Sequence, residues 1–388
     1  MSIASEITKL NSNLTDSYTA CNTKGASMPS ALNFDNLPDC IDSIQTGGGG
    51  IGIPREVVNG VYQMPSSNFT FSLPSNVTSL NPSVLQYAFY QCSTLVGVDL
   101  SNLTGLSSGA LTRAFYQCTN TSGTLDLSGL TSIVGGNAMQ YAFYQTRFSH
   151  LDLSSLTTIS GSNALNYAFS SCRFESIDLS SLTTISGGNA MSYAFNDNNK
   201  LTSIDLSSIT TVSGSNAMSY AFAACPYLTS VDLSGLTTVS GNSAFYYTFS
   251  SSTGLTSVDF SNLDTIGINA STANNAHFSN AFNSSNSLTS ITFPKLEKIY
   301  CTGSNQSHGT FYYNNKVQKF YFPKLDTITY GTGASSTNQN ACKYIFYGCS
   351  SLTEIHFGAA NQSAIEASPG YSTAWGRGAG NVTIYFDL

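Results

Sequence analysis

The chain has 388 residues, of which 41% are hydrophobic and only 9% are charged, and its formal net charge is −7. This composition supports a packed core and leaves solubility to Ser, Thr and Asn. It also excludes the basic surface expected of a nucleic-acid or anionic-membrane binder. A neutral or cationic partner, such as a glycan or a protein, fits the charge better.

The N-terminus shows neither a membrane span nor an export signal. No stretch of the chain approaches the ~20 consecutive apolar residues that cross a bilayer. The first ten residues, MSIASEITKL, lack the basic and apolar regions of a signal peptide. The sequence therefore predicts no membrane insertion and no export through a signal peptide of its own.

Residues 1–46 are predicted to form a small helical module. Ile3, Ile7, Leu10 and Leu14 form a short heptad seam, because they follow one another at helical spacing on one side. The seam predicts either a homo-oligomer or packing against a second helix of the same chain. Residues 47–54 are predicted to be a Gly-rich, flexible linker.

Residues 55–357 contain an internal repeat with the consensus L-T-S-I-D-L-S-x-L-T-T-I-S-G-x-N-A-M-x-Y-A-F-x-x-C. Apolar and polar residues alternate at the end of L-T-S-I-D-L, which predicts one β-strand per unit with one buried face. The segment N-A-M-x-Y-A-F is predicted to return as a short helical or extended stretch. Single units cannot bury their apolar face, so they must stack. We expect a parallel sheet roughly 50 Å long, with strands about 4.8 Å apart.

The pattern A-F-x-x-C followed by L-x-x-I-x-L resembles the BspA-like leucine-rich repeats of bacterial surface proteins and bacteriophages. The resemblance covers residues 69–357. It implies an α/β repeat solenoid with a parallel β-sheet on one face and a role in adhesion or recognition, but it does not fix a ligand. The chain departs from the usual pattern after the strand, where many members carry Pro and this chain carries Ser until Pro294 and Pro323.

Two further positions recur in the repeat. A cysteine three residues after the repeat Phe is predicted to be a buried core ladder rather than a disulfide, and it occurs at Cys92, Cys118, Cys172, Cys225 and Cys349. A tyrosine two residues before the Phe predicts either half-buried packing or a stacking platform for carbohydrate, and it occurs at Tyr87, Tyr141, Tyr167, Tyr193, Tyr220 and Tyr247.

An aspartate occupies the outward position of seven consecutive strands. In a parallel sheet these side chains lie about 4.8 Å apart, where like charges repel. Either an Asx-type hydrogen bond from the following Ser, protonation, or bound cations such as Ca²⁺ must relieve the repulsion. We predict that this row binds ligand, with no firm metal site: Asp99, Asp126, Asp152, Asp178, Asp205, Asp232 and Asp259. The row ends at Thr292, Tyr321 and His356, where lysines gather.

Residues 358–388 break the repeat and contain the only tryptophan. They predict a cap that closes the core of the solenoid. The alternative is a ligand tip in which Tyr371, Trp375 and Arg377 stack on a sugar.

The sequence carries no recognisable catalytic signature. H-E-x-x-H, a P-loop and G-x-S-x-G are absent, and the four histidines lack metal-ligand spacing. We therefore predict a non-enzymatic protein with no cofactor other than the Ca²⁺ considered above.

The N-terminal pattern K-G-A-S-M-P, L-P-D-C-I-D-S-I and poly-Gly is similar to segments of tail-associated proteins from phages and prophages of gut bacteria. This resemblance implies attachment to other virion proteins. The predicted function is thus a phage tail-associated or receptor-binding component, located in the virion, that recognises a bacterial surface protein or glycan. The alternatives are a structural spacer, a bacterial surface adhesin that is cytoplasmic before release, and a hydrolase of surface polysaccharide.

Overall fold

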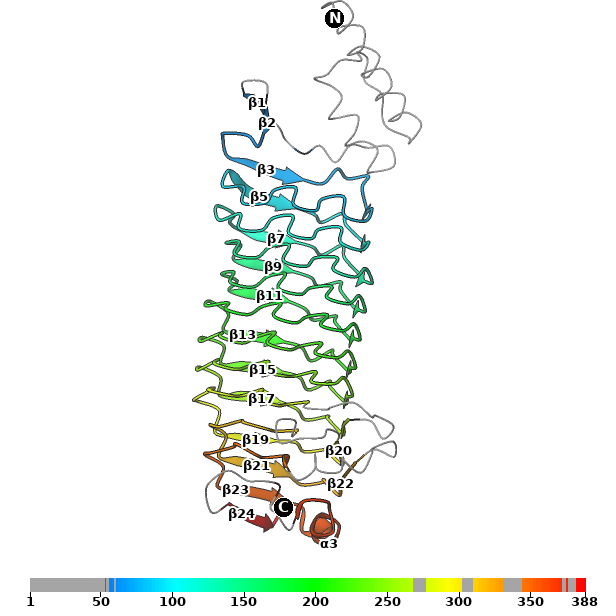
Figure 1. Cartoon of the computed structure of the whole chain (residues 1–388), viewed down its shortest axis with the longest axis vertical. Helices are drawn as coiled ribbons and strands as arrows, with labels where there is room; N and C mark the ends of the chain where they lie inside the picture. The colour runs from blue at the N-terminus through cyan, green and yellow to red at the C-terminus, as the bar shows by residue number, and fades with distance from the viewer. Residues whose placement is uncertain are drawn as a thin grey trace, which may run out of the picture.

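The computed structural model describes residues 53, 56–58, 61–267, 277–301, 310–330, 344–371, 375 and 382–388. From β3 onward these residues wind into a long stack of coils (Figure 1). Each coil contributes a strand to one side of the stack, and most contribute a second strand to another side. The predicted parallel solenoid is therefore confirmed. The predicted N-terminal module, its seam residues Ile3, Ile7, Leu10 and Leu14, and Arg377 lie outside the described residues.

The first strand of each coil lies on one side, which we call the strand face. Neighbouring strands within each of its sheets are parallel, and the same repeat positions pair from coil to coil. The strands are β3 (Phe69–Ser72), β5 (Leu95–Asp99), β7 (Thr124–Asp126), β9 (His150–Asp152), β11 (Ser176–Asp178), β13 (Ser203–Asp205), β15 (Ser230–Asp232), β17 (Ser257–Asp259), β19 (Ser290–Thr292), β21 (Lys319–Phe322), β23 (Glu354–Phe357) and β24 (Thr383–Phe386).

The strand face is not the single continuous sheet that was expected. Its pairing is interrupted between β11 and β13 and again between β17 and β19, which leaves sheets of five, three and four strands. The first interruption falls where the spacing of the strand aspartates grows by one residue, between Asp178 and Asp205. Coils of this longer length pair without interruption from β13 to β17. The second interruption coincides with the longer coil before β19.

A second sheet of ten parallel strands runs along another side of the stack. Its strands are short, and each inserts an aliphatic residue such as Ile159 or Ile185 into the core. They are β4 (Ser79–Leu80), β6 (Gly105–Leu106), β8 (Ser132–Ile133), β10 (Thr158–Ile159), β12 (Thr184–Ile185), β14 (Thr211–Val212), β16 (Thr238–Val239), β18 (Thr265–Ile266), β20 (Lys298–Cys301) and β22 (Thr327–Tyr330). An antiparallel pair, β1 (Glu56–Val58) and β2 (Val61–Gln63), precedes the coils.

The segment that returns from the second sheet to the next strand is neither helical nor extended, and this corrects the prediction. In one coil Asn163, Tyr167 and Ser171 have positive φ angles of 55°, 56° and 56°. Alternate amides close turns within the segment, and the others bond to the next coil, as Leu165 N donates to Ala190 O at 2.7 Å. The left-handed conformation costs energy for residues such as Tyr, and the hydrogen bonds between coils offset that cost. The helices among the described residues are η2 (Ala359–Asn361) and α3 (Gln362–Glu366).

The core is built around a continuous stack of the repeat phenylalanines. Phe115, Phe143, Phe169, Phe195 and Phe222 are fully buried, and successive rings are parallel within 13°, with centroids 4.9 to 5.6 Å apart. Each aromatic pair contributes about 0.5–1.5 kcal/mol beyond the area that it buries. The stack therefore holds each coil in register with the next.

The predicted cysteine ladder is confirmed, since all five predicted members are buried free thiols. It has a further role: Cys118 Sγ donates to Phe89 O at 3.0 Å, and Ser252 Oγ donates to Phe222 O at 2.8 Å from the same repeat position. Asn198 and Asn314 also occupy this position and donate to Phe carbonyls. The position therefore requires a small buried donor rather than cysteine in particular.

Candidate ligand-binding faces of the solenoid

The predicted aspartate row exists on the strand face. Asp126 pairs with Asp152, Asp152 with Asp178, and Asp205 with Asp232, so equal side chains follow one another along the sheets. In all seven units the Asp Oδ1 accepts a hydrogen bond from the backbone N–H of the Ser two residues later, at 2.8 to 3.1 Å. The Asx-type explanation of the row is confirmed.

Each aspartate is thus held by its own coil, and its second oxygen forms no hydrogen bond to the described protein. Three of the serines, Ser101, Ser128 and Ser180, also donate their hydroxyl to the same Oδ1. Among the described residues no group of three His, Cys, Asp or Glu side chains is arranged to hold a metal ion. The Ca²⁺ hypothesis therefore rests on the charge of the row alone.

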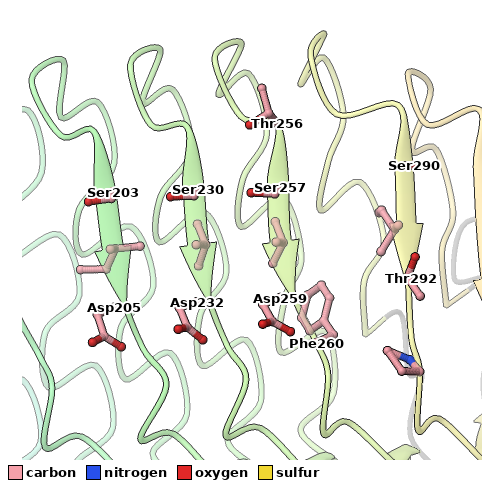
Figure 2. Close-up of a pocket in the computed structure, with 15 residues that line it drawn as sticks. Ser203, Asp205, Ser230, Asp232, Thr256, Ser257, Asp259, Phe260, Ser290 and Thr292 are labelled. Atoms are coloured by element: carbon pink, nitrogen blue, oxygen red, sulfur yellow. The ribbon is translucent and has the colours of Figure 1, made fainter.

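A shallow groove of about 720 Å³ lies on the strand face over β13 to β19. Figure 2 shows Asp205, Asp232 and Asp259 pointing the same way from successive strands, with a parallel row of serines two residues before them. Thr292 takes the place of the aspartate at the β19 end. The groove offers repeated hydroxyl and carboxylate oxygens, which suit a ligand rich in hydroxyl or amino groups.

The aspartate row continues into a different arrangement at the C-terminal end. Tyr321, His356 and Tyr385 stack with centroids 4.7 and 4.6 Å apart. His356 lies 3.0 Å from Glu354 and 2.9 Å from Asp387. Sequence reasoning missed Tyr385 and Asp387, because the short last strand, β24, lies outside the repeat pattern.

The tyrosine row does not form a sugar platform in the middle of the stack. Tyr141, Tyr167, Tyr193, Tyr220 and Tyr247 lie face to face, with successive centroids 4.3 to 4.7 Å apart. Each inner ring covers the faces of its neighbours, so only ring edges and hydroxyls remain for a ligand. Burial, followed by the neighbouring Tyr193, raises the pKa of Tyr167 and Tyr220, so these hydroxyls stay protonated.

The prediction that Trp375 forms part of a ligand tip is wrong. Trp375 is 0% exposed and packs edge-on against Phe346 and Tyr371, with centroids 6.1 and 5.3 Å apart. A buried ring cannot stack on a sugar. Half-buried Tyr371 packs on this same ring, so both residues close the end of the core, as the cap alternative predicts.

Comparison with known proteins identifies the repeat. Residues 61–186 and 136–276 match the family described as BspA type Leucine rich repeat region, with six copies, and together these matches span more than half of the chain. No curated protein matches the sequence. Among the described residues, no helix has the length and apolar character that a membrane crossing requires.

Solved structures of leucine-rich-repeat proteins align with much of the chain. A leucine-rich-repeat protein from Bacteroides ovatus ATCC 8483 is 18% identical, with 86% of this chain and 91% of that chain covered and a TM-score of 0.26. The functional domain of InlJ from Listeria monocytogenes, described as including a cysteine ladder, is 15% identical, with 76% and 72% covered and a TM-score of 0.22.

Proposed function

Because the chain belongs to the BspA-type leucine-rich-repeat family, we propose that it is a non-enzymatic binding protein that holds its ligand on the strand face. The groove over β13 to β19 carries this proposal, since the same serine and aspartate are presented coil after coil. General acid–base catalysis needs two groups whose surroundings separate their proton affinities. The repeated aspartates instead share one environment, which suits many equal contacts with an extended surface.

The ligand in this proposal is a protein or glycan on a bacterial surface, and the chain is a tail-associated or receptor-binding component of a phage. The support is the resemblance of the N-terminal sequence to phage tail-associated segments. In this arrangement residues 1–46 attach to other virion proteins and the solenoid contacts the host cell. Antibody labelling of phage particles by electron microscopy tests the location, and unlabelled tails would contradict it.

The binding test compares two triple variants that remove equal charge from two places along the row. D205N/D232N/D259N removes three charges from the groove, and D99N/D126N/D152N removes three charges outside it. Asn keeps the Oδ1 acceptor of the Asx-type bond, so both variants should fold, which circular dichroism checks. Binding to whole gut bacteria and to a glycan array is measured with and without Ca²⁺.

We expect the groove variant to lose about tenfold or more in affinity, which corresponds to about 1.4 kcal/mol, while the matched control stays close to the unsubstituted protein. Equal binding by all three proteins would remove the strand-face groove as the site. Release of glycan fragments by the unsubstituted protein would instead establish a hydrolase.

A further inference from the structure

Three cations occupy the same place in three consecutive coils. Arg147, Arg173 and Lys200 each stand five residues before the aspartate of their strand, in the turn that leads into it, and all three are exposed. Between residues 61 and 267 the only other Lys or Arg is Arg113. A chain this poor in cations therefore places nearly all those of its central coils in one row.

One carboxylate, that of Asp197, lines the same hollow as Arg147 and Arg173. Ion pairs among the described residues involve Lys319 and His356 but none of the three cations. The neighbouring carboxylate of Asp197 accepts a hydrogen bond from Ser171 Oγ at 3.1 Å. Like charges that repeat at a coil spacing of about 4.8 Å repel each other, so an anion bound along the row would relieve that repulsion.

The three cations line a groove rather than a convex edge. Two hollows, of about 280 and 680 Å³, share Arg173 and Asn199 and so form one depression. Arg147 lines the first hollow, and Lys200 lines the second. This basic groove lies beside the place where β11 and β13 do not pair, and it is separate from the strand-face groove.

An aromatic ring ends the basic groove. Tyr227 takes the position of the cations in the next coil, and it is 62% exposed. Unlike the stacked tyrosines of the return segments, it appears in none of the ring pairs of the described residues. Its free face suits stacking on a sugar ring, and Asn199, which lines both hollows, supplies an amide for hydroxyl groups.

We propose that the basic groove binds a linear acidic polysaccharide, with carboxylate or sulfate groups on its rings, whose chain runs along the solenoid axis. The coil spacing of about 4.8 Å is close to the length of one sugar unit in such a chain. An extended peptide repeats every 3.3 Å, or about 6.6 Å on one side, and stacked nucleotides every 3.4 Å or so, and neither period matches the row.

This site goes beyond the proposed function and uses different residues from it. Asp205, Asp232 and Asp259 line none of the basic groove. The variant D205N/D232N/D259N should therefore keep its affinity for an acidic polysaccharide. Failure of one proposal leaves the other standing.

The experiment measures binding of the full chain to polygalacturonate by calorimetry, beside its neutral methyl ester, a heparin-type sulfated glycan, polyglutamate and single-stranded DNA. The test variant is R147Q/R173Q/K200Q. The control, K295Q/K316Q/K324Q, removes three exposed lysines from the C-terminal coils and changes the net charge equally. A third variant, Y227A, removes the aromatic ring.

We expect polygalacturonate or the sulfated glycan to bind, the neutral ester not to bind, and affinity to fall with added salt. The test variant should bind about tenfold more weakly or worse, the Tyr227 variant should be intermediate, and the control should change less than about twofold. No binding of either acidic glycan, an equal loss in the control, or tighter binding of polyglutamate or DNA would each overturn the proposal.

Discussion

The central coils and the last coils use the strand face in opposite ways. Within the sheets from β7 to β17 each outward aspartate meets another aspartate, as Asp205 does with Asp232. From β19 to β24 an outward side chain meets a different residue, as Lys319 does with Glu354 at 2.8 Å. Lys319, and after it His356, lowers the pKa of the Glu354 carboxyl by hydrogen bonding.

This difference shows that a charged side chain repeated in every coil needs a hydrogen-bond partner within its own coil. A charged side chain that faces its own copy gains nothing from its neighbour, so it must be satisfied within its own coil, as each aspartate is by the serine that follows it. Where the copies differ, neighbouring coils satisfy each other. We expect substitutions in the central coils to act through the stacking of coils, and those near the end to act through particular partners.

The largest effect is expected at the cap. Trp375→Ala removes a fully buried ring that covers Phe346 and Phe357, and it should lower the free energy of unfolding by about 3–5 kcal/mol. Because this is the only tryptophan, urea unfolding has to be followed by circular dichroism rather than by its fluorescence. The control is Tyr385→Ala on the exposed strand face, which should lower the free energy of unfolding far less. An equal decrease in the two variants would show that Trp375 has no special role in closing the core.

A similar loss in the central coils should follow from one added methyl group. In Gly161, Gly187 and Gly214 an added Cβ would overlap the backbone carbonyl of the glycine one coil earlier. Gly187→Ala should therefore force neighbouring coils apart and lower the free energy of unfolding by about 3 kcal/mol. At the adjacent Gly188 the nearest atom to an added Cβ is 3.9 Å away, so Gly188→Ala is a matched control. If both variants melt at the same temperature, the close approach of the glycines does not limit the stack.

A pH effect distinguishes the later coils from the central ones. His277 occupies the repeat position held by Ala190, Ala217 and Ala244, and it is fully buried. Burial lowers the pKa of His277 from 6.5 to about 4, and a hydrogen bond with Gly241 O opposes this in part. Between pH 6.5 and about 4, His277 is therefore protonated in the unfolded chain and neutral in the folded chain. Stability is lost as the pH falls through this range.

Because of this linkage, the free energy of unfolding of the unsubstituted protein should fall by roughly 2–3 kcal/mol between pH 7 and pH 4.5 through His277. His277→Ala installs the residue of the central coils and should remove that part of the pH dependence, although its cavity lowers stability at pH 7. Carboxyl groups titrate alike in both proteins, so the difference between their two pH curves isolates the histidine. Parallel curves would mean that His277 is not held neutral.

Much of this structure is predictable from the repeat. The alternation in L-T-S-I-D-L gives the strands, and the following Ser gives the Asx-type bond of each aspartate. The positive φ of Tyr167 is not predictable in this way, because hydrogen bonds to the next coil impose it against the preference of the residue. The burial of Trp375 likewise depends on how the last coils end, which no repeat pattern describes.

The basic groove could have been found in the sequence but was not. Alignment on the strand aspartates places Arg147, Arg173 and Lys200 in one column, whereas a search for runs of Lys and Arg along the chain misses residues that are a full coil apart. The groove itself is not predictable, because the repeat pattern does not describe how the side chains of neighbouring turns leave a hollow between them.

The smallest effect is expected at the buried position three residues after the repeat Phe, where Cys, Ser and Asn all donate a hydrogen bond to a Phe carbonyl. Cys225 Sγ donates to Phe195 O at 3.4 Å, and Ser252 does the same for Phe222 one coil later. Cys225→Ser should therefore change the free energy of unfolding by less than about 1 kcal/mol, whereas Cys225→Ala should cost about 1–3 kcal/mol because it leaves a buried carbonyl without this donor. Burial raises the pKa of the Cys225 thiol to about 12, so a thiol reagent should modify it only after unfolding. Rapid modification of the folded protein, or equal stability of the Ser and Ala variants, would show that the position needs an apolar side chain rather than a donor.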